Sequence, residues 1–308
     1  MNPGPRIRAD TRVPSDADPL PRPRVSAARR LIALALAGAF AATLSACRFA
    51  RDPILSRYSN VQSFNYDIAV GPKQFHIEGY LTRSTEPGRR PSLLVLNGSD
   101  EKMDQCVAMS ERVALMRMQV ACVDIPGFGK SSGPSRFVGP PSVVAARRGL
   151  DLLASRSDVD PNRIAVWGLG NGAVAAGLLM DSDPRPRALI LQSGAYDLVH
   201  FWPEAPLRTK LAILREVWPS RRVLQARSVI EHLPPRLQVS VLILHGESDR
   251  RIPVMQAARL ADELRARGAK VWTCYFPTSS HDLGKRVEPE LRTFLRDNLI
   301  ASNDATPS

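Results

Sequence analysis

After about residue 60, the chain alternates short apolar runs with amphipathic stretches, and this alternation predicts most of its secondary structure. Two strands in which polar and apolar residues alternate are predicted first, at 61–70 and 74–83, with a turn at Gly71-Pro72 between them. The continuous apolar run that follows, at 92–96, is typical of a strand that is buried on both faces. The pattern therefore begins with a hairpin and continues into a buried sheet.

Strands and helices then alternate towards the end of the chain. The further predicted strands are 118–124, 163–168, 187–192, 240–245 and 271–276, and the predicted helices are 102–117, 141–155, 171–181, 254–268 and 287–299. Such alternation is typical of a mostly parallel sheet with right-handed crossovers and helices on both faces. We predict an α/β fold with an eight-stranded, mostly parallel sheet.

The stretch 198–238 interrupts this alternation with a more helical segment, which includes an Arg-rich helix around 206–216 and the aromatic residues Phe201, Trp202 and Trp218. One interpretation is a helical excursion that packs on the body of the domain. The other is a cap that covers a pocket and excludes water. We favour a cap insert, because the segment leaves the sheet just after the carboxyl end of a strand, where ligands bind in open α/β sheets.

A strand, a glycine-rich turn and a small-residue helix follow one another in residues 164–173, IAVWGLGNGA. This is the context of a nucleophile elbow, G-x-S-x-G, in which a Ser occupies a sharp strand-to-helix turn. The outer glycines are Gly168 and Gly172, but the central residue is Gly170. A glycine accepts the positive φ of such a turn with little strain, and it supplies no atom that could form an acyl-enzyme.

Four other loops follow predicted strand ends and carry polar residues. They are residues 97–100 (NGSD), 126–131 (PGFGKS), 247–253 (ESDRRIP) and 277–281 (PTSSH). Because the carboxyl ends of parallel strands meet at one edge of a sheet, we expect these loops to lie near the glycine-rich turn.

With the runs DIPGFGKSSGP, HGESDRRIP and PTSSHD, the chain resembles the α/β-hydrolase superfamily over about residues 60–300. The resemblance is to its prolyl-oligopeptidase-like and dienelactone-hydrolase-like branch. The order of elbow, then Asp, then His along the chain is the order of that fold. Each run is moderately specific alone, and the three at these spacings are specific together.

The resemblance implies roles for individual residues. Asp249 matches the triad acid and His281 the triad base, with the carboxylate holding the imidazole tautomer. The oxyanion hole would consist of the backbone N–H groups of Ser99 and Asn171. Gly170 matches the nucleophile position, where the Ser is absent. A merely structural Asp249–His281 hydrogen bond is the alternative interpretation of that pair.

Three other serines stand near the predicted site, Ser131, Ser132 and Ser193, but none lies at the elbow, so we set them aside as nucleophiles. The resemblance implies that Asp124 supports the neighbouring turn. Asn97 stands where the family often has His, which matters little for a backbone donor.

The amino-terminal region resembles that of a bacterial lipoprotein. Residues 31–46 are uncharged and follow Arg29-Arg30, as in a secretory signal, and they are too few to span a bilayer comfortably. Leu44–Cys47 resembles a lipobox, which implies cleavage before Cys47 and its lipidation. A plain signal peptide or an uncleaved anchor is the alternative. Arg48 follows the Cys instead of an Asp, which favours the outer over the inner membrane.

These features predict the domain organisation. Residues 1–46 form a leader and lipoprotein signal peptide, 47–60 a lipid-anchored tether and 61–308 the α/β-hydrolase domain. Residues 1–24 are rich in Pro and lack apolar periodicity, so we expect them to be disordered. They make the region before the apolar run unusually long for a lipoprotein signal, which suggests that translation starts downstream, with Val25 as a candidate.

The composition is that of an ordinary globular protein, with 44% hydrophobic residues and a net charge of +12. We expect a solvated basic surface and no nucleic-acid partner, because the chain lacks helix-turn-helix and zinc-finger spacing. We expect no metal and no cofactor. Cys106, Cys122 and Cys274 allow one disulfide and leave one thiol over, and we expect Cys122 and Cys274 to be buried small apolar residues.

Two hypotheses for function remain open. The first is a lipid-anchored protein of the cell envelope that lacks ordinary serine-hydrolase turnover and binds a ligand or partner. The second is an enzyme that uses the His281–Asp249 dyad with water, or without hydrolysis, on an acyl ester, an amide or an acylated envelope glycan. Dependence of any activity on His281 distinguishes them.

Overall fold

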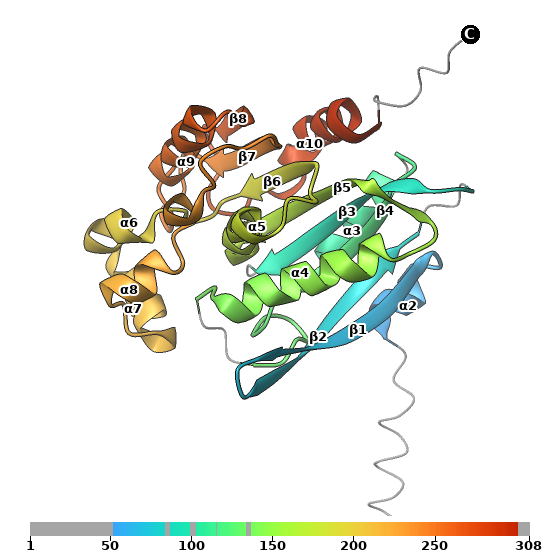
Figure 1. Ribbon diagram of the computed structural model, residues 1–308, viewed down its shortest axis with the longest axis horizontal. Coiled ribbons are helices and arrows are strands. Elements are labelled where there is room, and N and C mark those ends of the chain that lie inside the picture. The colour runs from blue at the N-terminus through green and yellow to red at the C-terminus, as the bar shows by residue number, and fades with distance from the viewer. Residues whose placement is uncertain (1–51, 84–86, 99–102, 115, 134–136, 301–308) are drawn as a thin grey trace, which may run out of the picture. The chain divides into compact units, whose positions relative to one another are not determined.

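The computed structural model describes residues 52–83, 87–98, 103–114, 116–133 and 137–300. The strands are β1 (Val61–Val70), β2 (Lys73–Thr82), β3 (Arg90–Gly98), β4 (Gln119–Asp124), β5 (Val159–Gly170), β6 (Ala188–Gln192), β7 (Ser240–Gly246) and β8 (Lys270–Phe276). They form one sheet in the order β1-β2-β4-β3-β5-β6-β7-β8 (Figure 1). The β1–β2 and β2–β4 pairs are antiparallel and the other pairs are parallel, so the prediction of an eight-stranded, mostly parallel sheet is confirmed.

Helices cover both faces of this sheet (Figure 1). They are α2 (Pro53–Arg57), α3 (Met103–Ala114), α4 (Pro140–Ala154), α5 (Asn171–Ser182), α6 (Leu198–Glu204), α7 (Leu207–Glu216), α8 (Arg221–Gln225), α9 (Met255–Ala266) and α10 (Glu288–Leu295), with short helical turns η2 (Val229–His232), η3 (Gly284–Val287) and η4 (Arg296–Ile300). The predicted helix 287–299 is thus divided, since α10 ends at Leu295 and the last turn is a π-helix.

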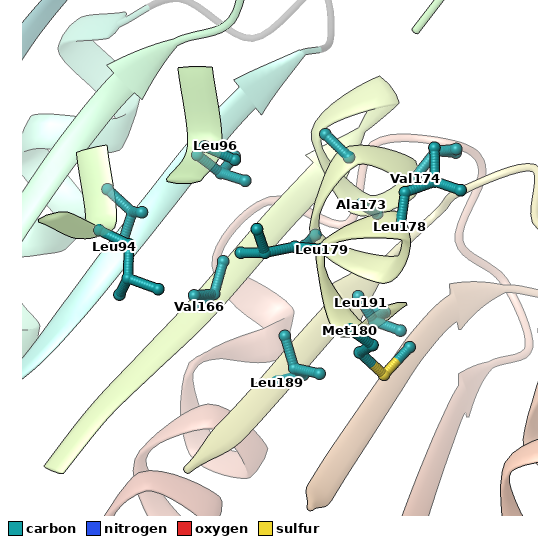
Figure 2. Close-up of a cluster of buried hydrophobic side chains, with 14 of the residues drawn as sticks. Leu94, Leu96, Val166, Ala173, Val174, Leu178, Leu179, Met180, Leu189 and Leu191 are labelled. Carbon is teal, nitrogen blue, oxygen red and sulfur yellow. The ribbon is translucent and has the colours of Figure 1, made fainter. Parts of the chain in front are cut away.

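The two-residue period of the strands builds two cores. Leu94 and Leu96 of β3 point to the face covered by α4, α5 and α9, whereas Leu93 and Val95 point to the face covered by α3 and α10. Figure 2 shows the first core under α5, where Leu179 lies against the β-strand side chains. This double burial explains why the central strands are continuous apolar runs in the sequence.

The predicted helical segment at 198–238 contains α6, α7, α8 and η2. α6 and α8 contact each other, and these helices share a small apolar cluster that includes Leu198, Phe201 and Leu224. The segment follows β6 and returns to the sheet at β7.

A disulfide joins Cys106 of α3 to Cys122 of β4. Cys122 is fully buried, as expected, but its sulfur is bonded to Cys106 and is not a free thiol. α3 crosses the face of β4, which places both cysteines in the same buried cluster with their Cα atoms 6.3 Å apart. Cys274 keeps its thiol and is half-buried.

In the part of the chain that the structure describes, none of the helices has the length and apolar character needed to cross a bilayer. The leader at 1–46, with Cys47, lies outside the described residues, and so does Ser99.

Candidate active site

The β5–α5 turn has the geometry of a sharp strand-to-helix elbow. Gly170 ends β5 with φ 57° and ψ −115°, and Asn171 begins α5 directly after it. A Cβ atom at Gly168 would lie 2.2 Å from the carbonyl oxygen of Gly172, and one at Gly172 would lie 1.9 Å from that of Leu96. Only glycines let the helix begin this close to the two strands, and the positive φ at residue 170 also favours glycine.

An Asp–His pair lies on two later loops. The His281 ring nitrogen Nδ1 is 2.7 Å from Oδ2 of Asp249. The other carboxylate oxygen, Oδ1, accepts hydrogen bonds from the backbone N–H groups of Arg251 and Ile252. These contacts hold the carboxylate in one orientation, and the carboxylate in turn orients the imidazole ring.

A second histidine, His245, reaches the same carboxylate from within β7. It is fully buried, with Nε2 2.9 Å from the carbonyl oxygen of Ile252 and 3.4 Å from Oδ2 of Asp249. Because a carbonyl only accepts, Nε2 carries the proton and donates it. His245 opens the HGESDRRIP run, but nothing in that run predicts a role for it in the site.

The pKa of Asp249 reflects this set of donors. Burial raises the pKa of the carboxyl, but hydrogen bonds from His245, His281 and the backbone N–H of Ile252 lower it more, so that it lies well below its ordinary value of 3.8. Asp249 is therefore ionised at neutral pH, as a group that orients a histidine must be.

This depressed pKa predicts an acid-sensitive contribution to folding. A carboxyl whose pKa is lower in the folded state adds stability that is complete above its unfolded pKa, near 4, and is lost as pH falls towards its folded pKa. We expect wild type to be more stable than Asp249→Asn at pH 7, and this difference to shrink as pH falls below about 4. Urea unfolding of both proteins at pH 7 and pH 3 measures it; an equal difference at the two pH values would contradict it.

The β4 loop is held by Asp124. The buried carboxylate accepts hydrogen bonds from the Asn97 side-chain amide at 2.8 Å and from the Lys130 backbone N–H at 3.2 Å. A Cβ at Gly129, where φ is +52°, would lie 1.8 Å from the same carboxylate. Burial raises the pKa of Asp124. These contacts fix the turn after β4 and involve neither His281 nor Gly170.

The elbow and the Asp–His pair open onto one pocket of about 500 Å³, lined by Gly170, Ser193, Asp249 and His281. An adjoining hollow of about 490 Å³ is lined by Asn171 together with Gly170 and His281. The structure thus brings four of the predicted site residues together: Gly170, Asn171, Asp249 and His281. Volumes of this size suit small-molecule ligands.

Ser193 is the one residue among the three set-aside serines that lines this pocket. It has a positive φ of 53°, and its hydroxyl donates to the backbone carbonyl of His281 at 2.9 Å. Ser131 instead donates to the backbone carbonyl of Asp124, and Ser132 accepts from the backbone N–H of His76. Ser193 therefore supports the His281 loop.

Arginines form much of the pocket wall. Arg208, from α7, and Arg250, from the loop after β7, line both hollows, and Arg215 of α7 lines the second. Within the described residues, the side chains of these three make no ion pair. Thr209 of α7 donates to the backbone carbonyl of Arg251, which ties the helix to the loop. The helical insert thus borders the pocket.

A sharp elbow after a central parallel strand, followed by an Asp and a His on loops at the same sheet edge, defines the α/β-hydrolase fold. Solved structures agree. The chain is similar to 2,6-dihydroxy-pseudo-oxynicotine hydrolase, with a TM-score of 0.63 and 21% identity over 82% of this chain and 72% of that one. An acetyl xylan esterase from Paenibacillus sp. R4 has a TM-score of 0.60 and 16% identity, with 80% and 91% covered. At these identities the likeness shows the fold.

Sequence relatives then give the family. The model of the prolyl oligopeptidase family matches residues 147–295. The uncharacterised protein Rv2307c of Mycobacterium tuberculosis is 30% identical over 209 residues, which are 66% of this chain and 68% of that protein. The uncharacterised peptidase YuxL of Bacillus subtilis is 26% identical over 147 residues, or 47% of this chain and 22% of its own length. The chain belongs to the α/β-hydrolase superfamily and to one family with the mycobacterial protein.

Proposed function

We propose that this hydrolase-like chain is a lipid-anchored protein of the cell envelope that binds a small ligand or partner and lacks ordinary serine-hydrolase turnover. One observation carries the proposal: the elbow, the oriented Asp249–His281 pair and the pocket are formed, and the residue at the elbow is Gly170. Glycine has no atom that could attack an acyl carbon, and loss of the nucleophile in other serine hydrolases costs on the order of 10⁶-fold in turnover.

The envelope location is supported by two separate features. The leader sequence before Cys47 has the order of a lipoprotein signal, and Arg48 after it favours the outer membrane. The Cys106–Cys122 disulfide is of a kind that persists in oxidising compartments such as the periplasm and is rare in the cytosol.

The chemistry of the pocket suggests the class of ligand. An acyl ester, an amide or an acylated envelope glycan would place its carbonyl near Asn171 and Gly170, as substrates of this fold do. The arginines at 208, 215 and 250 favour a ligand that also carries negative charge, because guanidinium groups bind carboxylates and phosphates through paired hydrogen bonds. We propose no nucleic-acid partner.

The intact Asp249–His281 pair supports a second candidate function, an enzyme without an elbow serine. A water molecule would attack the acyl carbon while His281 takes its proton through Nε2, and the same nitrogen would then protonate the leaving group. Proton abstraction from a bound substrate by this dyad, without hydrolysis, is the non-hydrolytic form of this candidate.

Hydrolysis of p-nitrophenyl acetate and butyrate by the full chain tests the proposal, with wild type and His281→Ala compared. We expect neither protein to release p-nitrophenol faster than buffer, because no nucleophile stands at the elbow. Turnover by wild type that is lost in His281→Ala would overturn the binding role and establish the dyad enzyme. The His281 side chain is only 20% exposed, so its removal changes packing inside the protein. Near-UV circular dichroism therefore serves as the control that His281→Ala is folded.

A further inference from the structure

The helix α7 carries an apolar stripe that faces solvent. Leu207, Leu211 and Leu214 are 73%, 48% and 42% exposed, and Trp218, two residues after the helix, is 79% exposed. Their spacing of four and three residues places the three leucines on one line along the helix. Large apolar side chains that are exposed singly are ordinary, but a contiguous line of them marks an interaction site.

The stripe is not the face by which α7 attaches to the domain. Ile213 is the buried residue of this helix, and Thr209 makes its hydrogen bond to the loop after β7. Arg208, Ala212 and Arg215 line the pocket. The leucine stripe is therefore a separate face, and the pocket and the stripe are two sides of the same helix.

Positive charges flank the stripe. Arg208 and Arg215, which also border the pocket, lie along one side of it. Lys210, whose ammonium donates to the backbone carbonyl of Pro203, lies along the other, and Arg221 and Arg222 begin the next helix. The acid in α7, Glu216, accepts a hydrogen bond from the backbone N–H of Phe137. An anionic surface would thus meet cations on both sides of the apolar line, since Arg and Lys can cover apolar surface with their stems and keep their charges at its edge.

We propose that α7 and Trp218 dock onto an anionic phospholipid surface, with the leucines and Trp218 among the upper acyl chains and the flanking cations at the phosphates. A strongly amphipathic helix of low overall hydrophobicity, with Lys and Arg on its polar side and Leu and Trp on the other, is typical of interfacial helices. Tryptophan favours the same depth. The contact stands whether or not Cys47 is lipidated.

Quenching of tryptophan fluorescence by brominated lipid tests this contact in the full chain. The protein is mixed with phosphatidylethanolamine–phosphatidylglycerol vesicles whose acyl chains either do or do not carry bromine. We expect bromine to quench the emission of wild type, and Trp218→Phe to lose most of this quenching. Trp272→Phe is the matched control, because Trp272 is also exposed, at 45%, but lies on β8. It should retain the quenching.

A second variant distinguishes the lipid contact of α7 from membrane attachment through Cys47. Leu211→Ser with Leu214→Ser alters only exposed side chains, so it should fold and still lose the quenching of Trp218. Quenching that is equal in wild type and Trp218→Phe would overturn the proposal even if the protein sediments with vesicles. An absence of quenching together with a dimer that these serine substitutions dissociate would overturn it in favour of a second copy of the chain.

Discussion

Gly170→Ser is expected to react with a fluorophosphonate probe and to hydrolyse short p-nitrophenyl esters, whereas wild type does neither. The substitution places a hydroxyl at a φ of 57° between a strand and a helix, in the pocket that His281 lines. The orientation of His281 by Asp249 is already present at 2.7 Å. The gain in turnover should span several orders of magnitude, with a ceiling on the order of 10⁶-fold set by what the nucleophile contributes in other serine hydrolases.

The same substitution should cost stability. A side chain at this positive φ is strained by about 1–3 kcal/mol, which urea unfolding would show as a lower midpoint at an unchanged slope. Gly170→Ala is the matched control, because it introduces the strain without the hydroxyl: it should be destabilised to a similar extent and remain unlabelled. Gly170→Ser combined with His281→Ala should fold and lose the new activity. A folded Gly170→Ser that is neither labelled nor active would mean that residue 170 is not the nucleophile position.

The site could be predicted in outline because its parts follow strand ends. Gly170, Asp249 and His281 each come shortly after an apolar run, and parallel strands deliver such loops to one edge of the sheet. The elbow could be predicted for a further reason. The helix backbone approaches the strands so closely that only glycine fits at 168 and 172, and these glycines are evident in the sequence.

His245 shows what sequence reasoning could not find. It lies inside the apolar run of β7, where it is fully buried, and nothing local distinguishes it from a core residue. Its contact with Asp249 depends on the turn that follows β7. This turn brings the carboxylate of Asp249 back to the histidine four positions earlier in the chain. The positive φ of Ser193 likewise arises from the loop after β6 and has no signature such as a glycine.

The exposure of the α7 leucines also could not be predicted from the sequence. Their helical spacing predicts an amphipathic helix, and the usual inference from that pattern is a buried apolar face. Ile213 is buried instead, because α7 contacts the domain on the side that carries Ile213 and Thr209. Tertiary packing therefore determines whether Ile213 or the leucine stripe faces the domain.

The sequence allowed one disulfide but could not assign its pairing, because Cys106 and Cys122 belong to a helix and a strand whose crossing brings them together. This disulfide leads to the second large expected effect. Replacing both cysteines, with Cys106→Ala and Cys122→Ala, should lower the stability by about 3 kcal/mol, since the bond closes a loop in the unfolded chain across a sequence separation of 16. The melting temperature should fall by about 6–12 °C for a domain of this size.

Cys274→Ala is the matched control for this prediction, because Cys274 is a thiol that is only half-buried and its loss should change the melting temperature little. A reductant should lower the melting temperature of wild type and of Cys274→Ala alike, and leave that of the double alanine variant unchanged. A double variant as stable as wild type would contradict a stabilising bond. A large effect instead means that the chain reaches its full stability only in an oxidising compartment, which is the condition that the proposed envelope location supplies.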